Sequence, residues 1–261
     1  METIKNSLII IMILCCLAFA QESKPIKVVI DAGHGGKDGG AVGVTGVKEK
    51  DICLEMALLL QKILVEKADI GITSLLTRSE DKFISLEERV AFANQSNADY
   101  FVSLHANSYQ IKKDNGFEVY YHALAGDEAS KDVTDRENTV VLDKNEKEET
   151  GHLFILWDLA QNEFLKESAE LADIMQNSID TAFNKGEDKK FSIKNRGVKQ
   201  ETFVVLRGVR TPAVLLEMGF ISNENEEANF KNKDFKEKYV NALLDAMISF
   251  KQKYQKKTEI K

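Results

Sequence analysis

The sequence contains little cysteine and little proline. Two of its three cysteines, Cys15 and Cys16, fall in the apolar segment at the N-terminus. Cys53 is therefore the only cysteine beyond that segment, which excludes an intrachain disulfide in the rest of the chain, and we predict that Cys53 packs in the core. The two prolines are Pro25, near the start of the first predicted strand, and Pro212, just before the last.

Positive charge is also scarce, because 35 Lys and Arg face 42 Asp and Glu, for a net charge of −7. This deficit argues against general nucleic-acid binding. Much of it lies between Gly126 and Gly151, where nine acidic and four basic residues occur. We interpret residues 126–159, which lack a regular pattern, as an acidic insertion into the fold.

Long apolar runs are absent beyond the N-terminus. Residues 8–20 form a 13-residue apolar run, which is shorter than the roughly 20 residues of a membrane-spanning helix. Ala18-Phe19-Ala20 fits the small-x-small pattern of signal-peptide cleavage. We therefore predict a signal peptide over residues 1–20, export of the protein, and no transmembrane anchor after cleavage. An uncleaved anchor is the alternative.

The remainder, residues 21–261, predicts a single α/β domain. Six segments have the composition of strands, and they alternate with helical patterns: 27–31, 72–77, 100–105, 117–121, 202–206 and 213–217. Such alternation predicts a mostly parallel sheet with helices on both faces.

Helix starts are marked by capping residues. Ser85 and Glu88 form a capping-box pattern, and Asn223 with Glu226 and Asp234 with Glu237 predict two further helix starts. Residues 164–183 predict a long amphipathic helix, and the last helix has an apolar stripe that includes Phe235.

Three apolar runs end on side chains that can bind a metal or carry a proton. VVIDAGHGG contains His34, YFVSLHANS contains His105, and VLLEMGFISN contains Glu217. Ligand crevices of parallel α/β sheets lie at the carboxyl ends of the strands, so these three side chains are expected to meet there. A metallohydrolase is the hypothesis that this arrangement favours.

Each of these residues also has a structural interpretation. The glycine-rich segment DAGHGGKDGG around His34 could suggest a phosphate loop, but it matches neither the Gly-x-x-x-x-Gly-Lys-Ser/Thr nor the Gly-x-Gly-x-x-Gly pattern. His105 could be a buried core histidine, and Glu49 an ordinary glutamate at a helix start. A carboxylate such as Glu217 at the end of a buried strand is costly unless it is paired or bound to metal.

Together the four residues suggest a zinc site. Catalytic zinc commonly takes three ligands from His, Asp and Glu side chains and leaves one position for water. The candidate ligands are His34, Glu49 and His105, and Glu217 is the candidate general base and acid. The sequence contains no His-Glu-x-x-His motif, so the site must be assembled from distant segments.

Four segments of the chain resemble one enzyme family in order and in residue type. They are VVIDAGHGGKDGGAVG, KEKD, LTRSEDKFISLEERVAFANQSNADYFVSLHANS and LRGVRTPAVLLEMGFISNENE. From about residue 26 to 251 the chain is similar to the zinc-dependent N-acetylmuramoyl-L-alanine amidases of the amidase-3 class. The resemblance implies a six-stranded α/β/α fold and hydrolysis of the amide between muramic acid and L-alanine in peptidoglycan. It implies one Zn²⁺ held by His34, Glu49 and His105, with Glu217 as the catalytic glutamate.

The resemblance also carries an expectation for residues 126–159. In regulated relatives an insertion at this place forms a helix that covers the zinc site and offers a glutamate to the open position. The same is expected here, with Glu146, Glu148 and Glu149 as candidates and an activator protein as a partner of the insertion. A solvated surface loop is the alternative.

The expected setting is the periplasm or cell envelope, and the expected role is cell-wall remodelling or daughter-cell separation. A zinc peptidase that cuts within the stem peptide and a non-catalytic peptidoglycan-binding module remain alternatives. An enzyme that cleaves sugars with paired carboxylates would leave His34 and His105 unexplained.

Overall fold

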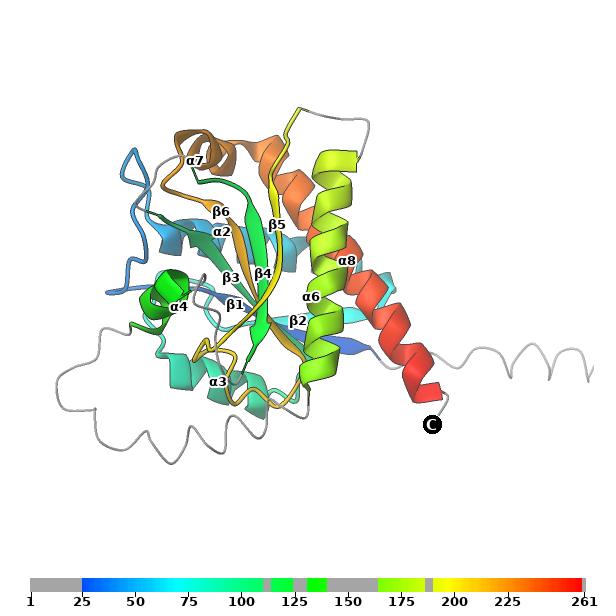
Figure 1. Ribbon diagram of the computed structural model, residues 1–261. Helices are drawn as coiled ribbons and strands as arrows, with labels where there is room; N and C mark the ends of the chain where they lie inside the picture. Colours follow the sequence, from blue (N-terminus) through cyan, green and yellow to red (C-terminus); the bar gives the residue numbers. More distant parts are fainter. Residues whose placement is uncertain (1–24, 110–113, 124–130, 140–163, 186–189, 260–261) are drawn as a thin grey trace, which may run out of the picture.

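The computed structural model describes residues 25–109, 114–123, 131–139, 164–185 and 190–259. The signal peptide expected over residues 1–20 and the candidates Glu146, Glu148 and Glu149 lie outside these residues. The strands in Figure 1 are β1 (Ile26–Ala32), β2 (Ile72–Leu76), β3 (Tyr100–Asn107), β4 (Phe117–His122), β5 (Asn195–Glu201) and β6 (Ala213–Phe220). The helices are α2 (Glu49–Glu66), η1 (Ala68–Ile70), α3 (Leu86–Gln95), α4 (Lys131–Asn138), α6 (Leu165–Asp180), η3 (Thr181–Lys185), α7 (Glu224–Lys231) and α8 (Lys233–Glu259).

The strands form one sheet in the order β2-β1-β3-β6-β4-β5. Neighbouring strands are parallel, except that β4 runs antiparallel to β6. The predicted α/β class with a mostly parallel sheet is therefore confirmed. In the registers that result, Glu217 on β6 lies beside both His105 on β3 and Glu118 on β4.

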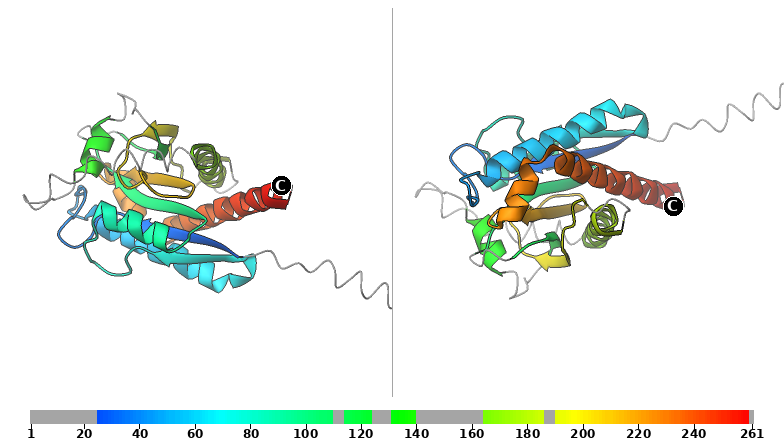
Figure 2. Two further views of the ribbon diagram at one scale, coloured as in Figure 1. Left: turned by 90° about the horizontal axis from the view of Figure 1, so that it is seen from below. Right: turned by 90° about the horizontal axis from the view of Figure 1, so that it is seen from above.

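The central strands are buried on both faces. Every residue of β3 and β6 is buried, as expected for the middle of a sheet that helices cover on both sides. The larger core lies against α2, α6 and α8, and the smaller one lies against α3 and α4. The three layers are visible in Figure 2, and they confirm the predicted α/β/α arrangement.

The fifth strand differs from the prediction. It is β5, Asn195–Glu201, whereas residues 202 and 203 have no regular structure and residues 204–208 form a turn. The apolar side chains of Phe203, Val205 and Leu206 are buried in the smaller core from that irregular segment. β5 is an edge strand of mostly half-buried polar residues, so it lacks the apolar run that indicates a strand.

Most predicted caps are confirmed. Ser85 and Glu88 form a full capping box at α3, and the Asn223 side chain accepts backbone hydrogen bonds at the start of α7. Glu226 instead accepts from the backbone N–H groups of Gly116 and Phe220. The cap predicted at Asp234 is wrong, because Asn232 accepts from the first N–H groups of α8.

Two further predictions concern helix packing and length. The apolar stripe of α8, which includes Phe235, is buried, and so is Cys53. The helix predicted over residues 164–183 is α6 followed by the π-helical turn η3.

Candidate metal centre

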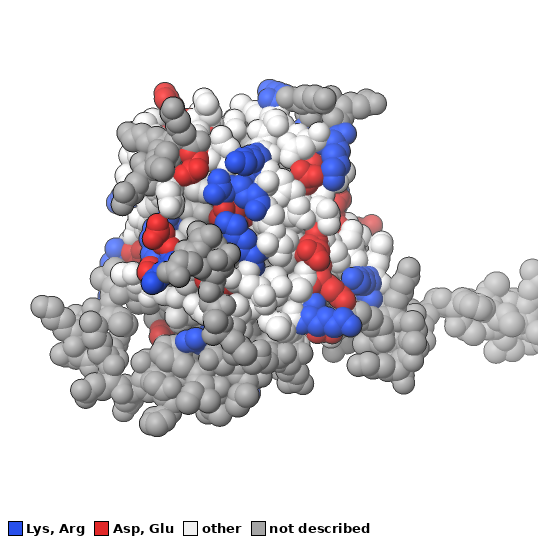
Figure 3. All heavy atoms as spheres, viewed as in Figure 1, with Lys and Arg blue, Asp and Glu red and all other residues white. Residues whose placement is uncertain are grey.

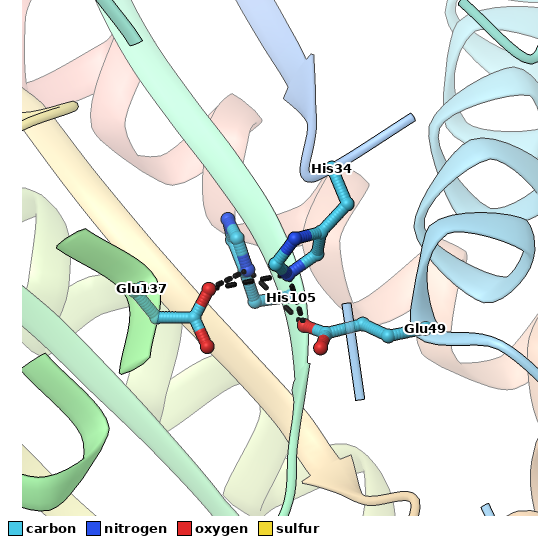
Figure 4. Close-up of side chains that lie close together, drawn as sticks. All are labelled: His34, Glu49, His105 and Glu137. Atoms are coloured by element: carbon cyan, nitrogen blue, oxygen red, sulfur yellow. Dashed lines mark hydrogen bonds and ion pairs between the residues drawn. The ribbon is translucent and has the colours of Figure 1, made fainter. Parts of the chain in front are cut away.

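Four side chains converge at the carboxyl edge of the sheet. His34 follows β1, Glu49 begins α2, His105 lies on β3, and Glu137 comes from α4 (Figure 4). One potential ligand atom from each lies within 4.8 Å of the others. The structure thus brings together the three residues expected as metal ligands and adds Glu137, which the sequence analysis did not single out.

The distances between these side chains are short. Oε1 of Glu49 lies 3.1 Å from both Nε2 of His34 and Nδ1 of His105. On the opposite side, Oε2 of Glu137 lies 3.2 Å from Nε2 of His34 and 2.9 Å from Nδ1 of His105. The two histidines therefore face two carboxylates across a single point.

The loop after β1 holds His34 in an unusual conformation. Its φ is 57°, in the left-handed region that few non-glycine residues adopt. Nη2 of the buried Arg89 donates a 2.6 Å hydrogen bond to the carbonyl of His34. Nδ1 of the ring lies 2.9 Å from Oδ2 of Asp38. A proton on Nδ1 that is donated to Asp38 leaves Nε2 free to bind a metal.

Glu49 is fixed by backbone groups. Its side chain is fully buried, Oε1 accepts from the N–H of Ala106, and Oε2 accepts from the N–H of Ala41. Its position in the first turn of α2 also favours a negative charge. These contacts explain how a glutamate that follows no apolar strand becomes part of the site.

Glu137 reaches the site because α4 packs onto the sheet edge. Val133 of α4 belongs to the smaller core, and Glu137 follows it by four residues, on the same face of the helix. Asn138 donates to the carbonyl of Thr202 and accepts from the N–H of Val204. The four-residue spacing between Val133 and Glu137 is the sequence signal that could have suggested this glutamate.

The electrostatics of the cluster favour a bound cation. Burial lowers the pKa of His105, but the carboxylates of Glu137 and Glu49 together outweigh this effect and raise the pKa to about 10. Burial also lowers the pKa of His34, and Glu49 raises it well above its ordinary value. Burial raises the pKa of Glu137, yet His105 brings that pKa well below its usual range. The two carboxylates thus hold positive charge on the rings, and a metal cation between the rings would take the place of those protons.

Glu217 lies next to this cluster and is fully buried. Among the described residues, neither of its side-chain oxygens has a hydrogen-bond partner, and Nη2 of Arg136 lies 3.6 Å from Oε1. Burial, followed by the Glu137 carboxylate, raises the pKa of Glu217 well above its ordinary value. The carboxyl group is therefore positioned to exchange a proton with a neighbouring molecule.

The residues present fit a zinc ion. Two imidazole nitrogens and carboxylate oxygens are the donors that catalytic zinc takes in proteins. Nε2 of His34 and Oε2 of Glu137 are buried and have no hydrogen-bond partner among the described residues, although they lie 3.2 Å apart. A cation between them would satisfy both atoms.

An α/β/α sheet that carries this cluster and a buried glutamate at its carboxyl edge defines the class of α/β hydrolytic enzymes with a metal-binding site. The sequence model of the N-acetylmuramoyl-L-alanine amidase family Amidase_3 matches residues 28–249. The chain belongs to this family, and it is an N-acetylmuramoyl-L-alanine amidase that hydrolyses peptidoglycan of the cell wall.

Known proteins resemble the chain over most of its length. It is 34% identical over 228 residues to the N-acetylmuramoyl-L-alanine amidase AmiA of Escherichia coli K12, covering 85% of this chain and 75% of AmiA. It is 31% identical to AmiC of Escherichia coli O6:H1, covering 88% of this chain and 54% of AmiC. The catalytic domain of CwlV from Bacillus (Paenibacillus) polymyxa has a similar structure, with 31% identity, a TM-score of 0.64, and coverage of 87% and 98%.

Action on peptidoglycan places the enzyme outside the cytoplasm. Across the described residues, the structure contains no helix with the length and apolar character needed to cross a membrane.

Proposed function

We propose that the enzyme is a zinc amidase in which His34, Glu49 and His105 hold one ion and Glu217 moves the proton. The observation that carries this proposal is the buried cluster of two histidines and two glutamates beside Glu217. The donor types suit zinc, and two carboxylates face the two imidazole rings, where a cation would lie.

Each side chain then has a distinct role. When bound, zinc activates water and polarises the carbonyl of the scissile amide. Glu217 accepts a proton from the attacking water and returns it to the nitrogen of the departing L-alanine. Burial of Glu217 removes competing water from its carboxyl group. Asp38 and Arg89 keep His34 in one tautomer and one backbone conformation.

Zinc analysis combined with mass spectrometry of peptidoglycan digests tests these roles. The wild type should contain one zinc and release intact peptides that begin with L-alanine. His34→Ala should lose both zinc and activity. Glu217→Gln should keep its zinc while activity falls by about 10²–10⁴-fold. Full activity of Glu217→Gln would remove Glu217 from the mechanism, and fragments cut within the stem peptide would favour a zinc peptidase.

We also propose that α4 inhibits the enzyme through Glu137. This glutamate is buried against both histidines, at the side of the cluster opposite Glu49. A substrate carbonyl would need the same position, so α4 must move before the amide can bind. An activator protein that displaces the insertion over residues 126–159 would release the site.

Opposite changes in two measurements test this inhibition. Glu137→Gln should bind zinc more weakly, because a ligand is lost, and should hydrolyse peptidoglycan faster. Asp135→Asn is a matched control, since Asp135 is exposed on the same helix, and it should change neither quantity. Removal of residues 131–149 should also raise activity. If Glu137→Gln stays folded and is no faster than Asp135→Asn, α4 does not inhibit.

We further propose that residues 1–20 are a signal peptide and that the enzyme acts in the periplasm or cell envelope, in cell-wall remodelling or daughter-cell separation. The apolar run and the Ala18-Phe19-Ala20 pattern support export. N-terminal sequencing of the exported protein should begin at Gln21. An uncleaved N-terminus in the membrane fraction would instead support an anchor.

A further inference from the structure

The edge strand β5, two strands from Glu217, carries two basic side chains that point toward β4. Within β5, the four residues from Asn195 to Val198 lie opposite the three from Phe117 to Val119 on β4, so that β5 contains one extra residue. The bulge lies at Gly197, whose φ of 90° favours glycine. As a result Arg196 and Lys199 both turn toward β4 on the face that holds Glu217.

Both cations meet the same buried carboxylate. Nε of Arg196 and Nζ of Lys199 lie 2.5 and 2.8 Å from Oε1 of Glu118. Glu118 in turn is the register partner of Glu217. Side chains from three adjacent strands therefore form a row from Glu217 through Glu118 to the two cations.

The two cations have more N–H donors than Glu118 takes up, because only Nε of Arg196 and Nζ of Lys199 donate to it. Burial raises the pKa of Glu118, but Lys199 and its other partners bring the pKa below its ordinary value, so the carboxylate is ionised. Asp114 forms a longer ion pair with Arg196, in which Oδ1 lies 3.7 Å from Nη1 without a hydrogen bond. The side chains of Arg196 and Lys199 are 25% and 26% exposed. Figure 3 shows basic side chains gathered over β4 and β5.

The position of the two cations suits a substrate group. Adjacent strands lie about 4.8 Å apart, so β5 lies about 10 Å from β6 and from Glu217. An extended peptide spans about 3.3–3.6 Å per residue, and about 10 Å therefore corresponds to two or three residues from the scissile amide. Stem peptides carry a free carboxylate at their second residue unless it is amidated, and a further one at the third where that residue is a diamino dicarboxylic acid.

We propose that Arg196 and Lys199 bind a free carboxylate at the second or third residue of the stem peptide. This inference rests on the amidase activity and on Glu217 marking the position of the reacting amide. It makes the pair a specificity element for acidic over amidated stems. The alternative is that both cations only neutralise Glu118 and Asp114.

Kinetics on defined muropeptides distinguish these roles. The substrates carry free carboxylates, or an amide at residue two, or an amide at residue three. Arg196→Gln and Lys199→Gln should each raise KM about tenfold for the acidic substrate, with kcat within about twofold. Amidation of the carboxylate that the pair binds should abolish this effect. The same substitutions should therefore hardly change KM for one of the two amidated substrates, and that substrate identifies the carboxylate. Arg196→Lys should retain part of the preference.

The same measurements are made in the wild-type and Glu137→Gln backgrounds, so that access past α4 does not limit them. Lys236→Gln is the control, since Lys236 pairs with Glu55 on the face of α2 and α8. An equal loss on all three substrates, or a loss in kcat alone, would overturn the inference and leave the amidase function intact. Failure of both backgrounds to hydrolyse any muropeptide would overturn the function and the inference together.

Discussion

A single methyl group behind His105 should weaken metal binding without removing any ligand. A Cβ built at Gly33 lies 2.5 Å from Cε1 and Nε2 of His105, whereas ordinary contacts begin at 3.4 Å. The ring and the loop must therefore separate by about 0.9 Å in Gly33→Ala, at a cost of about 1–3 kcal/mol for such overpacking. The methyl group presses on the edge of the ring opposite Nδ1, the atom that faces Glu49 and Glu137.

This strain should appear mainly in the zinc-bound state. Without metal the ring can turn away from the methyl group, whereas binding requires its return. The strain of about 1–3 kcal/mol then corresponds to roughly 5–150-fold weaker zinc binding. Competition against a chelator of known affinity measures this change, and thermal unfolding without zinc shows whether the fold is intact.

The matched control is Gly39→Ala in the same loop. Its Cβ would meet only Cδ of Lys48, at 3.7 Å, and neither Gly33 nor Gly39 lies in the left-handed region. Gly39→Ala should therefore bind zinc like the wild type. If the zinc affinities of the two variants agree within twofold, the reasoning that His105 is a ligand held against Gly33 is refuted.

Three further predictions concern stability. Arg89→Ala leaves the buried Asp31 carboxylate without its cation and should lower the free energy of unfolding by about 3–5 kcal/mol. Lys62→Ala, in an exposed pair, should change this free energy by less than about 1 kcal/mol. Urea unfolding measures both variants, and similar values would contradict the reasoning. Ser85→Ala should cost about 1 kcal/mol through loss of the capping box in the same assay, and no change would show that the cap is dispensable. Burial raises the pKa of Glu226 to about 7, so its contribution to stability is fully present below about pH 4.5 and is lost as the pH rises through 7. Glu226→Gln should flatten this decline in stability. An unchanged slope of stability between pH 5 and 8 would show that another group causes the decline.

The strands at the centre of the sheet were predictable because most of their residues are apolar. β3 and β6 are buried on both faces, so every position favours an apolar or small residue, and His105 and Glu217 are exceptions that draw attention. β5 could not be found in this way. Its polar residues suit the edge of a sheet, and the apolar segment that follows is buried from an irregular conformation.

The sequence by itself determined the family, the fold class and the four residues expected to form the site, because each lies in a segment whose pattern is recognisable locally. The tertiary structure decided what surrounds them. Glu137 becomes a neighbour of His34 and His105 only because α4 docks on the sheet edge. Likewise, Arg196 joins the row beside Glu217 only through the register of β4 with its two neighbours. Such contacts link residues about 30 to 100 positions apart, and no local pattern of charge or hydrophobicity specifies which distant segment will lie alongside.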